Sequence, residues 1–286
     1  MKCNSNDNSN ANIESSSVPL PSMKFTHTSQ SNESGHAIGI TRDGAAYSWS
    51  IRKQGPVNEF GQLGRGPTPK SSKSKLSNPG KVTVYDGDDG SQGDKSTSPS
   101  LPVTFLRGYT GGTDESGHSA LLDITRRHLY LCGCDRWQQL GLGSHHAGAL
   151  GYTWKGGKIW QTEFYRNEFL DYFLEKNNES IRDVALGGDH TVVLTESNRD
   201  VITFGRGGEG QLGGVGKPFV SAPTKSKILS SDKVSAVCAV KDCTLTINDS
   251  GDILKMVGKC RGRGFQEYIN ACRERAKNEG LVRNTQ

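Results

Sequence analysis

The chain has no long apolar run, and this absence argues against membrane-spanning helices at the level of sequence. No stretch approaches the roughly 18 consecutive apolar residues that such a helix needs. The stretch from Met1 to Ser17 is rich in serine and asparagine and contains no apolar core of a secretory signal. We therefore expect an intracellular protein, cytoplasmic or nuclear. The serine content leaves a mitochondrial location open.

Motifs of enzyme chemistry are also missing. The sequence contains neither Gly-x-Ser-x-Gly nor His-Glu-x-x-His, the patterns that present a nucleophilic serine or a zinc-binding helix. The seven cysteines have no paired Cys-x-x-Cys spacing, and an odd number without a regular framework predicts reduced thiols. These cysteines are Cys3, Cys132, Cys134, Cys238, Cys243, Cys260 and Cys272. We predict a protein without catalysis, cofactor or bound metal.

Two short segments imitate ligand-binding motifs. Residues 205–210 fit Gly-x-Gly-x-x-Gly, but the Gln-Leu-Gly that follows is a poor start for the helix that a dinucleotide site requires. Residues 86–94 are rich in aspartate, but Thr97 stands where a calcium loop needs a bidentate glutamate. Neither segment predicts a site.

What the sequence does contain is glycine, with 36 residues, and a repeat. One pattern occurs three times: a histidine, an apolar run, a turn, a second apolar run and a closing Gln-Leu-Gly. The histidines are 82 and 72 residues apart and the glutamines 77 and 72, a period that indicates a repeat architecture. We assign structural roles to the recurring residues, which are Gly35, His36, Gly61, Gln62, Leu63, Gly64, Gly117, His118, Gln139, Leu140, Gly141, His190, Gly205, Gly210, Gln211, Leu212 and Gly213.

This pattern resembles the repeat of the regulator of chromosome condensation (RCC1) family, with the best matches at 35–66 and 187–213. The resemblance implies an all-β fold, a β-propeller with blades of four antiparallel strands. Because the chain shows only four repeat cores, we expect a reduced or incomplete propeller of about four to five blades. Short helical insertions and a C-terminal helix complete the expected fold. In such blades the glycines permit tight turns, the histidines and glutamines bond to backbone groups, and the leucines pack between sheets.

The fourth copy of the repeat is degenerate. Cys243 stands where the other copies have histidine, a hairpin is predicted between Leu245 and Gly258, and no Gln-Leu-Gly follows. A strand predicted at 23–27, around Phe25, is a candidate to complete this last blade.

Three regions follow along the chain. Residues 1–22 are predicted to be disordered, residues 23–258 to form the propeller, and residues 259–286 to form a basic helical tail. Insertions interrupt the propeller at 67–100 and 144–180.

Each insertion contains one predicted element. The first holds a strand at 81–85, and the second holds an amphipathic helix at 163–176, whose apolar residues pair at helical spacing. The helix is a candidate partner contact wherever its apolar side chains prove exposed. The sequence assigns no individual contact residues.

The formal net charge of +5 lies in the tail: from Lys255 to Gln286, eight Lys/Arg residues face three acidic ones. Our first functional hypothesis is a non-catalytic interaction scaffold or regulatory module whose partners are proteins. The alternative is a guanine-nucleotide exchange factor for a small GTPase like Ran, the activity of the best-known member of that family, although the repeat itself does not imply it. A further alternative is a nucleic-acid or organelle-associated factor that acts through the basic tail.

Overall fold

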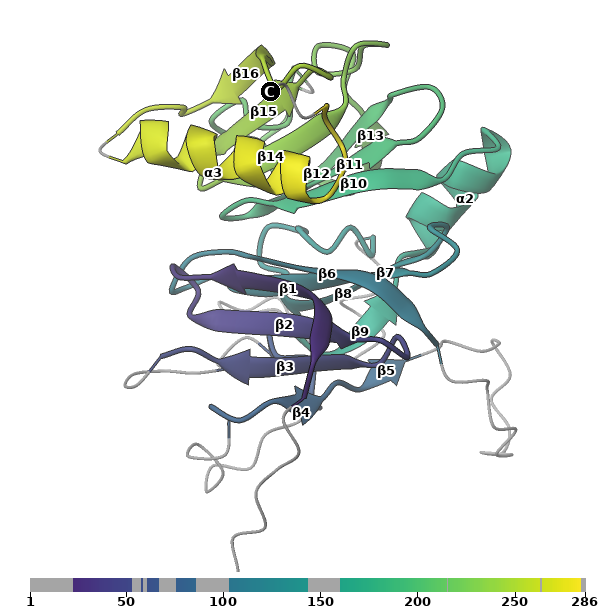
Figure 1. Cartoon of the computed structure of the whole chain (residues 1–286). Coiled ribbons are helices and arrows are strands. Elements are labelled where there is room, and N and C mark those ends of the chain that lie inside the picture. The colour runs from purple at the N-terminus through teal and green to yellow at the C-terminus, as the bar shows by residue number, and fades with distance from the viewer. Residues whose placement is uncertain are drawn as a thin grey trace, which may run out of the picture.

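The computed structural model describes residues 23–52, 58, 61–66, 76–85, 103–143, 160–214, 216–262 and 264–283. The fold is mostly β, with four sheets that we name A to D in chain order (Figure 1). Neither helix of the described part has the length and apolarity needed to cross a membrane. The predicted disordered segment and the parts 67–75, 86–100 and 144–159 of the predicted insertions lie outside the described residues, so the predictions for these parts stay untested.

Sheet A consists of β1 (Phe25–Ser31), β2 (His36–Thr41), β3 (Ala46–Ser50) and β4 (Gly80–Lys81). All its neighbours run antiparallel. The β2–β3 connection contains the Asp-Gly pair that the sequence marks as a hairpin turn, and Gly44 there has a φ of 80° that disfavours other residues.

Sheet B consists of β6 (Phe105–Gly111), β7 (His118–Asp123), β8 (Leu129–Cys134) and β9 (Trp160–Arg166), with β5 (Val84–Tyr85) parallel to β9 at its edge. The single strand predicted at 81–85 is therefore wrong. Lys81 ends β4 in sheet A and Val84 begins β5 in sheet B, so this short segment joins two blades.

Sheet C consists of β10 (Ile181–Leu186), β11 (His190–Thr195), β12 (Val201–Arg206) and β13 (Phe219–Lys225). Helix α2 (Glu168–Lys176) precedes it. The predicted helix began too early, because Phe164 and Tyr165 belong to β9, where their side chains alternate between the two sheet faces. Helical spacing over a short apolar stretch did not distinguish the end of a strand from the helix that follows it.

Sheet D has three strands, β14 (Ala236–Val240), β15 (Cys243–Ile247) and β16 (Ile253–Gly258), and α3 (Phe265–Asn278) follows it. The predicted hairpin of the fourth repeat is confirmed by β15 and β16. The expectation that the N-terminal strand completes the last blade is wrong, since β1 pairs with β2.

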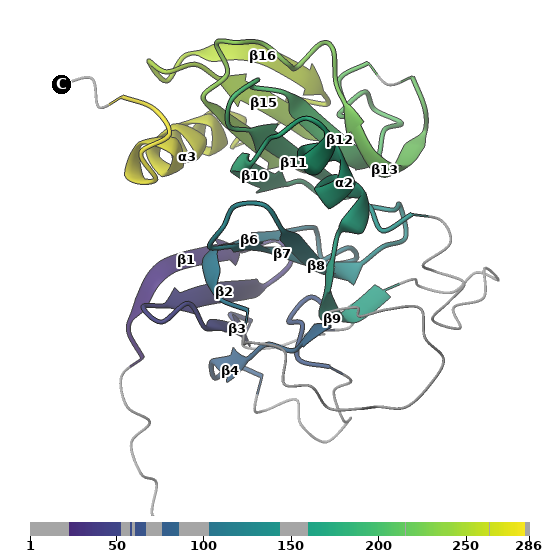
Figure 2. The same cartoon turned by 90° about the vertical axis from the view of Figure 1, so that its right-hand side faces the viewer.

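The four sheets form a propeller arrangement of four blades. Within each sheet the antiparallel strands follow chain order, with β5 added beside β9 in sheet B, and the strands β1, β6, β10 and β14 lie innermost. Packing of these strands joins A to B, B to C and C to D, and no packing of similar extent among the described strands joins D to A. The blades therefore form an arc, whose two halves are seen in Figures 1 and 2.

Apolar layers fill the space between neighbouring blades. Strand alternation sends Ile38 and Ile40 of sheet A toward sheet B, and Val192 and Leu194 of sheet C toward sheet D. The outer face of sheet D is different. It packs against α3 through Ile269, Cys272 and Ala276, so a helix occupies the place of a following blade.

The thiols differ from the sequence-based expectation. Cys243 and Cys260 form a disulfide that ties the start of β15 to the end of β16. Reduced thiols are confirmed for the other cysteines of the described part, which are Cys132, Cys134, Cys238 and Cys272, all buried.

Candidate interaction site

The repeated histidine and glutamine meet at the junction between blades. His36 Nε2 lies 2.7 Å from the hydroxyl of Ser119 in the next blade, and that hydroxyl donates to the carbonyl of Gln62, also at 2.7 Å. Because a hydroxyl has a single proton, His36 must donate from Nε2, while Nδ1 lies 2.9 Å from the hydroxyl of Ser34. We call this histidine–hydroxyl–glutamine chain the latch.

The latch recurs at the other junctions with one variation. Between sheets C and D, His190 Nε2 lies 2.8 Å from the Thr244 hydroxyl, which donates to the carbonyl of Gln211 at 2.7 Å. Between sheets B and C, Thr191 donates to the carbonyl of Gln139 at 2.7 Å. The Nε2 atom of His118 is buried there without a hydrogen-bond partner among the described residues.

Burial decides the protonation of the three histidines. Desolvation lowers the pKa of His36 and His190 to about 3 and that of His118 to about 4. All three are therefore neutral at physiological pH. Full burial of three neutral imidazoles, two of which bond to the neighbouring blade, supports the structural interpretation of these residues, and they offer no surface to a substrate.

The Gln-Leu-Gly segments form tight turns after the third strand of a blade and before its fourth strand. Leu63, Leu140 and Leu212 are buried, as packing between sheets requires. The glycine after each leucine has a positive φ, and at Gly64 a Cβ atom would lie 2.2 Å from the Phe164 ring. The turn thus needs glycine both for its backbone conformation and for its contact with the next strand.

Both ends of the arc lack a latch residue. The latch hydroxyl comes from the second residue of the second strand of a blade. Sheet A has Ala37 at this position. The histidine that extends the latch to the next blade is replaced in sheet D by Cys243. Sequence reasoning missed the hydroxyl positions, although a Ser or Thr directly after the histidine or Cys243 recurs at three of the four copies and could have revealed them.

Helix α3 is bound to the innermost strands by a buried ionic network. Arg275 forms two hydrogen bonds with the fully buried Asp183 of β10, at 2.8 and 2.9 Å, and donates to the carbonyl of Val237 in β14 at 2.6 Å. Although burial disfavours its charge, Asp183 holds the pKa of Arg275 above its ordinary value. Glu279, just past the helix, accepts from Arg107 of β6 at 2.9 Å and lies 3.7 Å from His27 of β1.

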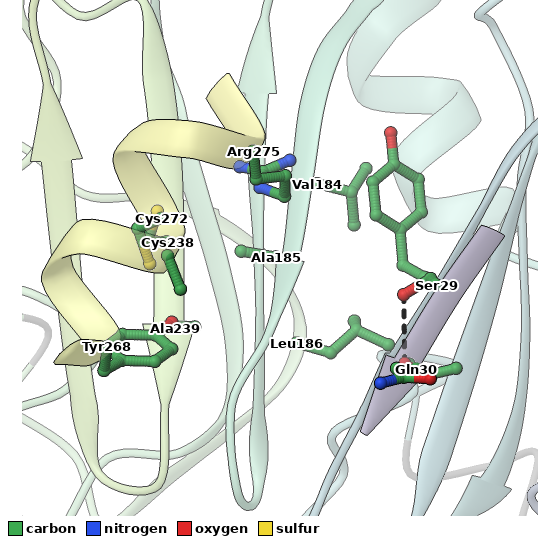
Figure 3. A pocket seen from close by; sticks show the side chains of 13 residues that line it. Ser29, Gln30, Val184, Ala185, Leu186, Cys238, Ala239, Tyr268, Cys272 and Arg275 are labelled. Atoms are coloured by element: carbon green, nitrogen blue, oxygen red, sulfur yellow. Dashed lines mark hydrogen bonds between the residues drawn. The ribbon is translucent and has the colours of Figure 1, made fainter. Parts of the chain in front are cut away.

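This helix closes a small cavity on the axis of the arc (Figure 3). The cavity has a volume of about 260 Å³ and is lined by all four innermost strands and by α3, including Gln30, Leu186, Ala239, Tyr268 and Arg275. Ligand pockets for small molecules are usually larger, about 300–1,000 Å³. The cavity therefore does not by itself indicate a small-molecule site.

Three exposed aromatic side chains lie on two neighbouring elements of the outer rim. Phe169 and Tyr172 of α2 are 49% and 67% exposed, and Phe219 of the neighbouring β13 is 46% exposed. We call these three residues the rim patch. Asn167 caps α2 and also donates to the carbonyl of Leu140, so the helix is fixed to the Gln-Leu-Gly turn of the second repeat. Phe169 and Tyr172 lie in the predicted helix, whereas no pattern in the sequence pointed to Phe219.

The other motifs bring no chemical groups together. Among the described ranges, no group of three or more His, Cys, Asp or Glu side chains could hold a metal ion. Residues 205–210 end β12 and enter a turn, not a helix. The acidic segment 86–94 lies outside the described residues.

The basic tail is largely engaged within the molecule. Besides Arg275, Lys277 pairs with Glu274 at 3.2 Å, Arg283 with Asp249 at 2.6 Å, and Lys259 with Glu209 at 2.8 Å. These four cations of the tail therefore have acidic partners within the molecule.

The fold and the repeated junctions define a class: a partial β-propeller built from latched blades. A family model described as the regulator of chromosome condensation (RCC1) repeat matches residues 181–211, which cover β10, β11 and β12. This match, together with the relatives described next, confirms the resemblance to RCC1-type repeat proteins seen in the sequence.

Known relatives are longer than this chain. The mitochondrial RCC1 domain-containing protein RUG3 of Arabidopsis thaliana is 25% identical over 219 residues, which cover 76% of this chain and 39% of RUG3. Protein RCC2 of Homo sapiens is 24% identical over 253 residues, with coverage of 76% and 47%. The structure of Prp20p from Saccharomyces cerevisiae, described with its binding properties to Gsp1p and histones, aligns with a TM-score of 0.56 at 16% identity over 82% of this chain and 46% of Prp20p. The chain thus spans less than half the length of these relatives.

Proposed function

We propose that this chain is a non-catalytic interaction module that binds a partner protein through the rim patch. The observation that carries the proposal is the exposure of Phe169, Tyr172 and Phe219 on elements that are themselves fixed to the blade core. Exposed aromatic residues on a rigid scaffold are typical anchors of protein interfaces. The latches and the buried network supply the rigidity that such an anchor needs.

Site-specific photo-crosslinking tests this proposal. A photoreactive amino acid replaces Tyr172 in one sample and Met256 in another, since Met256 is 48% exposed on sheet D, away from the patch. We expect a discrete protein adduct in lysate at position 172 that is absent at 256 and is lost when Phe169 is changed to Ser. Identical adducts at both positions, or none at 172, would contradict the proposal.

Guanine-nucleotide exchange is the second candidate function. It is supported by the structural similarity to Prp20p, whose structure is described together with its binding to Gsp1p. Exchange needs no covalent chemistry, only tighter binding to the nucleotide-free GTPase. The test is retention of a purified Ran-type GTPase on the immobilised chain in EDTA and in Mg²⁺ with GDP. Retention restricted to EDTA supports exchange, and equal or absent retention argues against it.

A role of the tail in nucleic-acid binding finds less support. Arg275, Lys277 and Arg283 are paired within the protein, so we do not propose it. Deletion of 259–286 is also unsuitable as a test, because it would remove α3 from the core of sheet D.

A further inference from the structure

A second aromatic surface lies on the face of sheet A that points away from sheet B. The Phe25 ring stacks on Trp49 with 5.3 Å between centroids and lies 6.2 Å from the ring of Tyr47. It also covers Gly39, where a Cβ atom would approach it to 2.6 Å. We call Phe25, Tyr47 and Trp49 the end face. Each of these rings is only half-buried, and none belongs to an apolar core of the described residues.

The other end of the arc shows how such a face can be closed. The outer face of sheet D is apolar as well, and the amphipathic helix α3 packs on it. Ionic groups at the end of the helix then reach the inner strands. Within the described part of the chain, no comparable helix packs on sheet A.

An ordinary blade is a poor complement for the end face. At each observed junction the following blade supplies a hydroxyl to the latch, from Ser119, Thr191 or Thr244. Sheet A offers Ala37 at that position, which cannot receive a histidine or donate to a glutamine carbonyl. The complement of this face therefore comes from a different kind of element, and an apolar sheet face without a second sheet is covered by helix.

The charges around the end face favour a negatively charged partner. Lys24 precedes Phe25, Arg42 follows the residue paired with Phe25, and Lys81 lies directly opposite Tyr47 in the sheet register. All three are exposed and form no salt bridge among the described residues. Asp43 is the acidic residue of this region, and its carboxylate interacts electrostatically with Lys81. Two copies of this face would repel one another, whereas an acidic segment would be attracted.

We propose that the end face docks an acidic amphipathic helix of a partner protein, with apolar side chains on the aromatic rings and carboxylates toward Lys24, Arg42 and Lys81. This surface is separate from the rim patch, so either one can fail without the other. Helix-on-surface recognition of this kind relies on apolar residues at helical spacing for affinity and on flanking charges for specificity.

The probe is a fluorescein-labelled helical peptide of 18 residues, with leucine along one face and glutamate on the other, titrated with the full chain and followed by anisotropy. A second peptide with lysine in place of glutamate tests the charge requirement. We expect saturable binding of the acidic peptide alone, weakened at least about tenfold by Trp49→Ser, as for an aromatic anchor. We expect about threefold weakening by Lys81→Glu, as for an exposed charge.

Matched variants separate this site from other surfaces and from loss of fold. Tyr172→Ser changes the rim patch, and Lys227→Glu reverses an exposed charge on the sheet C side, so both should bind the peptide like the unchanged chain. Circular dichroism of every variant confirms folding before titration. Absence of binding, equal binding of both peptides, or equal loss in Tyr172→Ser would overturn the proposal. So would a concentration-dependent dimer in light scattering that Trp49→Ser abolishes, since it would make a second copy the occupant.

Discussion

The two ends of the arc are made from the same repeat and are finished in different ways. At the sheet D end, Leu245 and Ile247 lie under α3 and are almost fully buried. At the sheet A end, Tyr47 and Trp49 remain half-exposed beside a cluster of cations. The last blade of a repeat protein exposes the apolar face that a neighbour would have covered, so it needs a cap. Within the described residues one end carries its cap, and no helix packs on the other.

This difference separates the residues that build the blade junctions from the residues that are left for a partner. His36, Gln62 and their counterparts recur because they lie at the junctions between blades, and they stop where a junction stops. The surfaces that remain for a partner lie where no blade junction forms, on α2 and β13 and on the outer face of sheet A. The repeat thus explains the fold, whereas the candidate sites are found by asking which faces it leaves uncovered.

The largest contrast should come from truncating one residue at each end. Leu245→Ala opens a cavity beneath α3 and should cost about 2–5 kcal/mol of unfolding free energy. Tyr47→Ala removes a half-exposed ring and its contact with Phe25, worth about 1 kcal/mol. Urea unfolding of both variants measures the difference. Equal losses would mean that the end face is as well packed as the capped face.

Removal of the ionic anchor of the cap should have the next largest effect. Arg275→Ala leaves the Asp183 carboxylate buried without its cation, and such losses are about 3–5 kcal/mol in fully buried pairs. Because the Arg275 side chain is 29% exposed, we expect about 3 kcal/mol, the lower end of that range. Lys277→Ala on the same helix, which breaks an exposed pair with Glu274, is the matched control and should cost less than about 0.5 kcal/mol. The idea fails if urea titrations give the two variants the same midpoint.

Sequence reasoning reached the fold further than the sites, for a physical reason. Hairpins such as β15–β16 are local, and alternation with a turn residue specifies them within a few residues. The contact of Arg275 with Asp183 joins residues 92 positions apart, and no local pattern marks such a pair. The predicted helix at 163–176 was wrong at its start because Phe164 and Tyr165 fit both the helical spacing and the alternation of a strand. Phe219 is unremarkable as a strand residue and becomes noticeable only when α2 lies beside it.

Acid should lower the free energy of unfolding through the buried histidines at the blade junctions. The three latch histidines have folded-state pKa values below the unfolded value of about 6.5, so the unfolded chain binds more protons as the pH falls. Between pH 7 and 5.5 each should remove about 1 kcal/mol of stability. Burial raises the pKa of Asp135 to about 7, which acts in the opposite direction and leaves a net loss of about 2 kcal/mol.

The measurement is urea unfolding at the two pH values, for the unchanged chain and for Asp135→Asn. Because the variant lacks the opposing carboxyl group, its stability should fall more steeply toward pH 5.5. A variant with the same pH dependence as the unchanged chain would contradict the assignment of Asp135.

The smallest contrast lies within the latches themselves. Thr244→Val removes a hydroxyl that serves both the Gln211 carbonyl and His190, and leaves two buried groups unpaired, at a cost of about 2 kcal/mol. Thr191→Val leaves only the Gln139 carbonyl unpaired, because His118 Nε2 has no partner at that junction, and should cost about 1 kcal/mol. Valine keeps the side-chain shape in both cases, so packing changes little. Thermal and urea unfolding of the pair measure what the histidine adds to a latch. If Thr191→Val is the more harmful of the two, the histidine is incidental to the junction and the glutamine carbonyl alone holds the blades together.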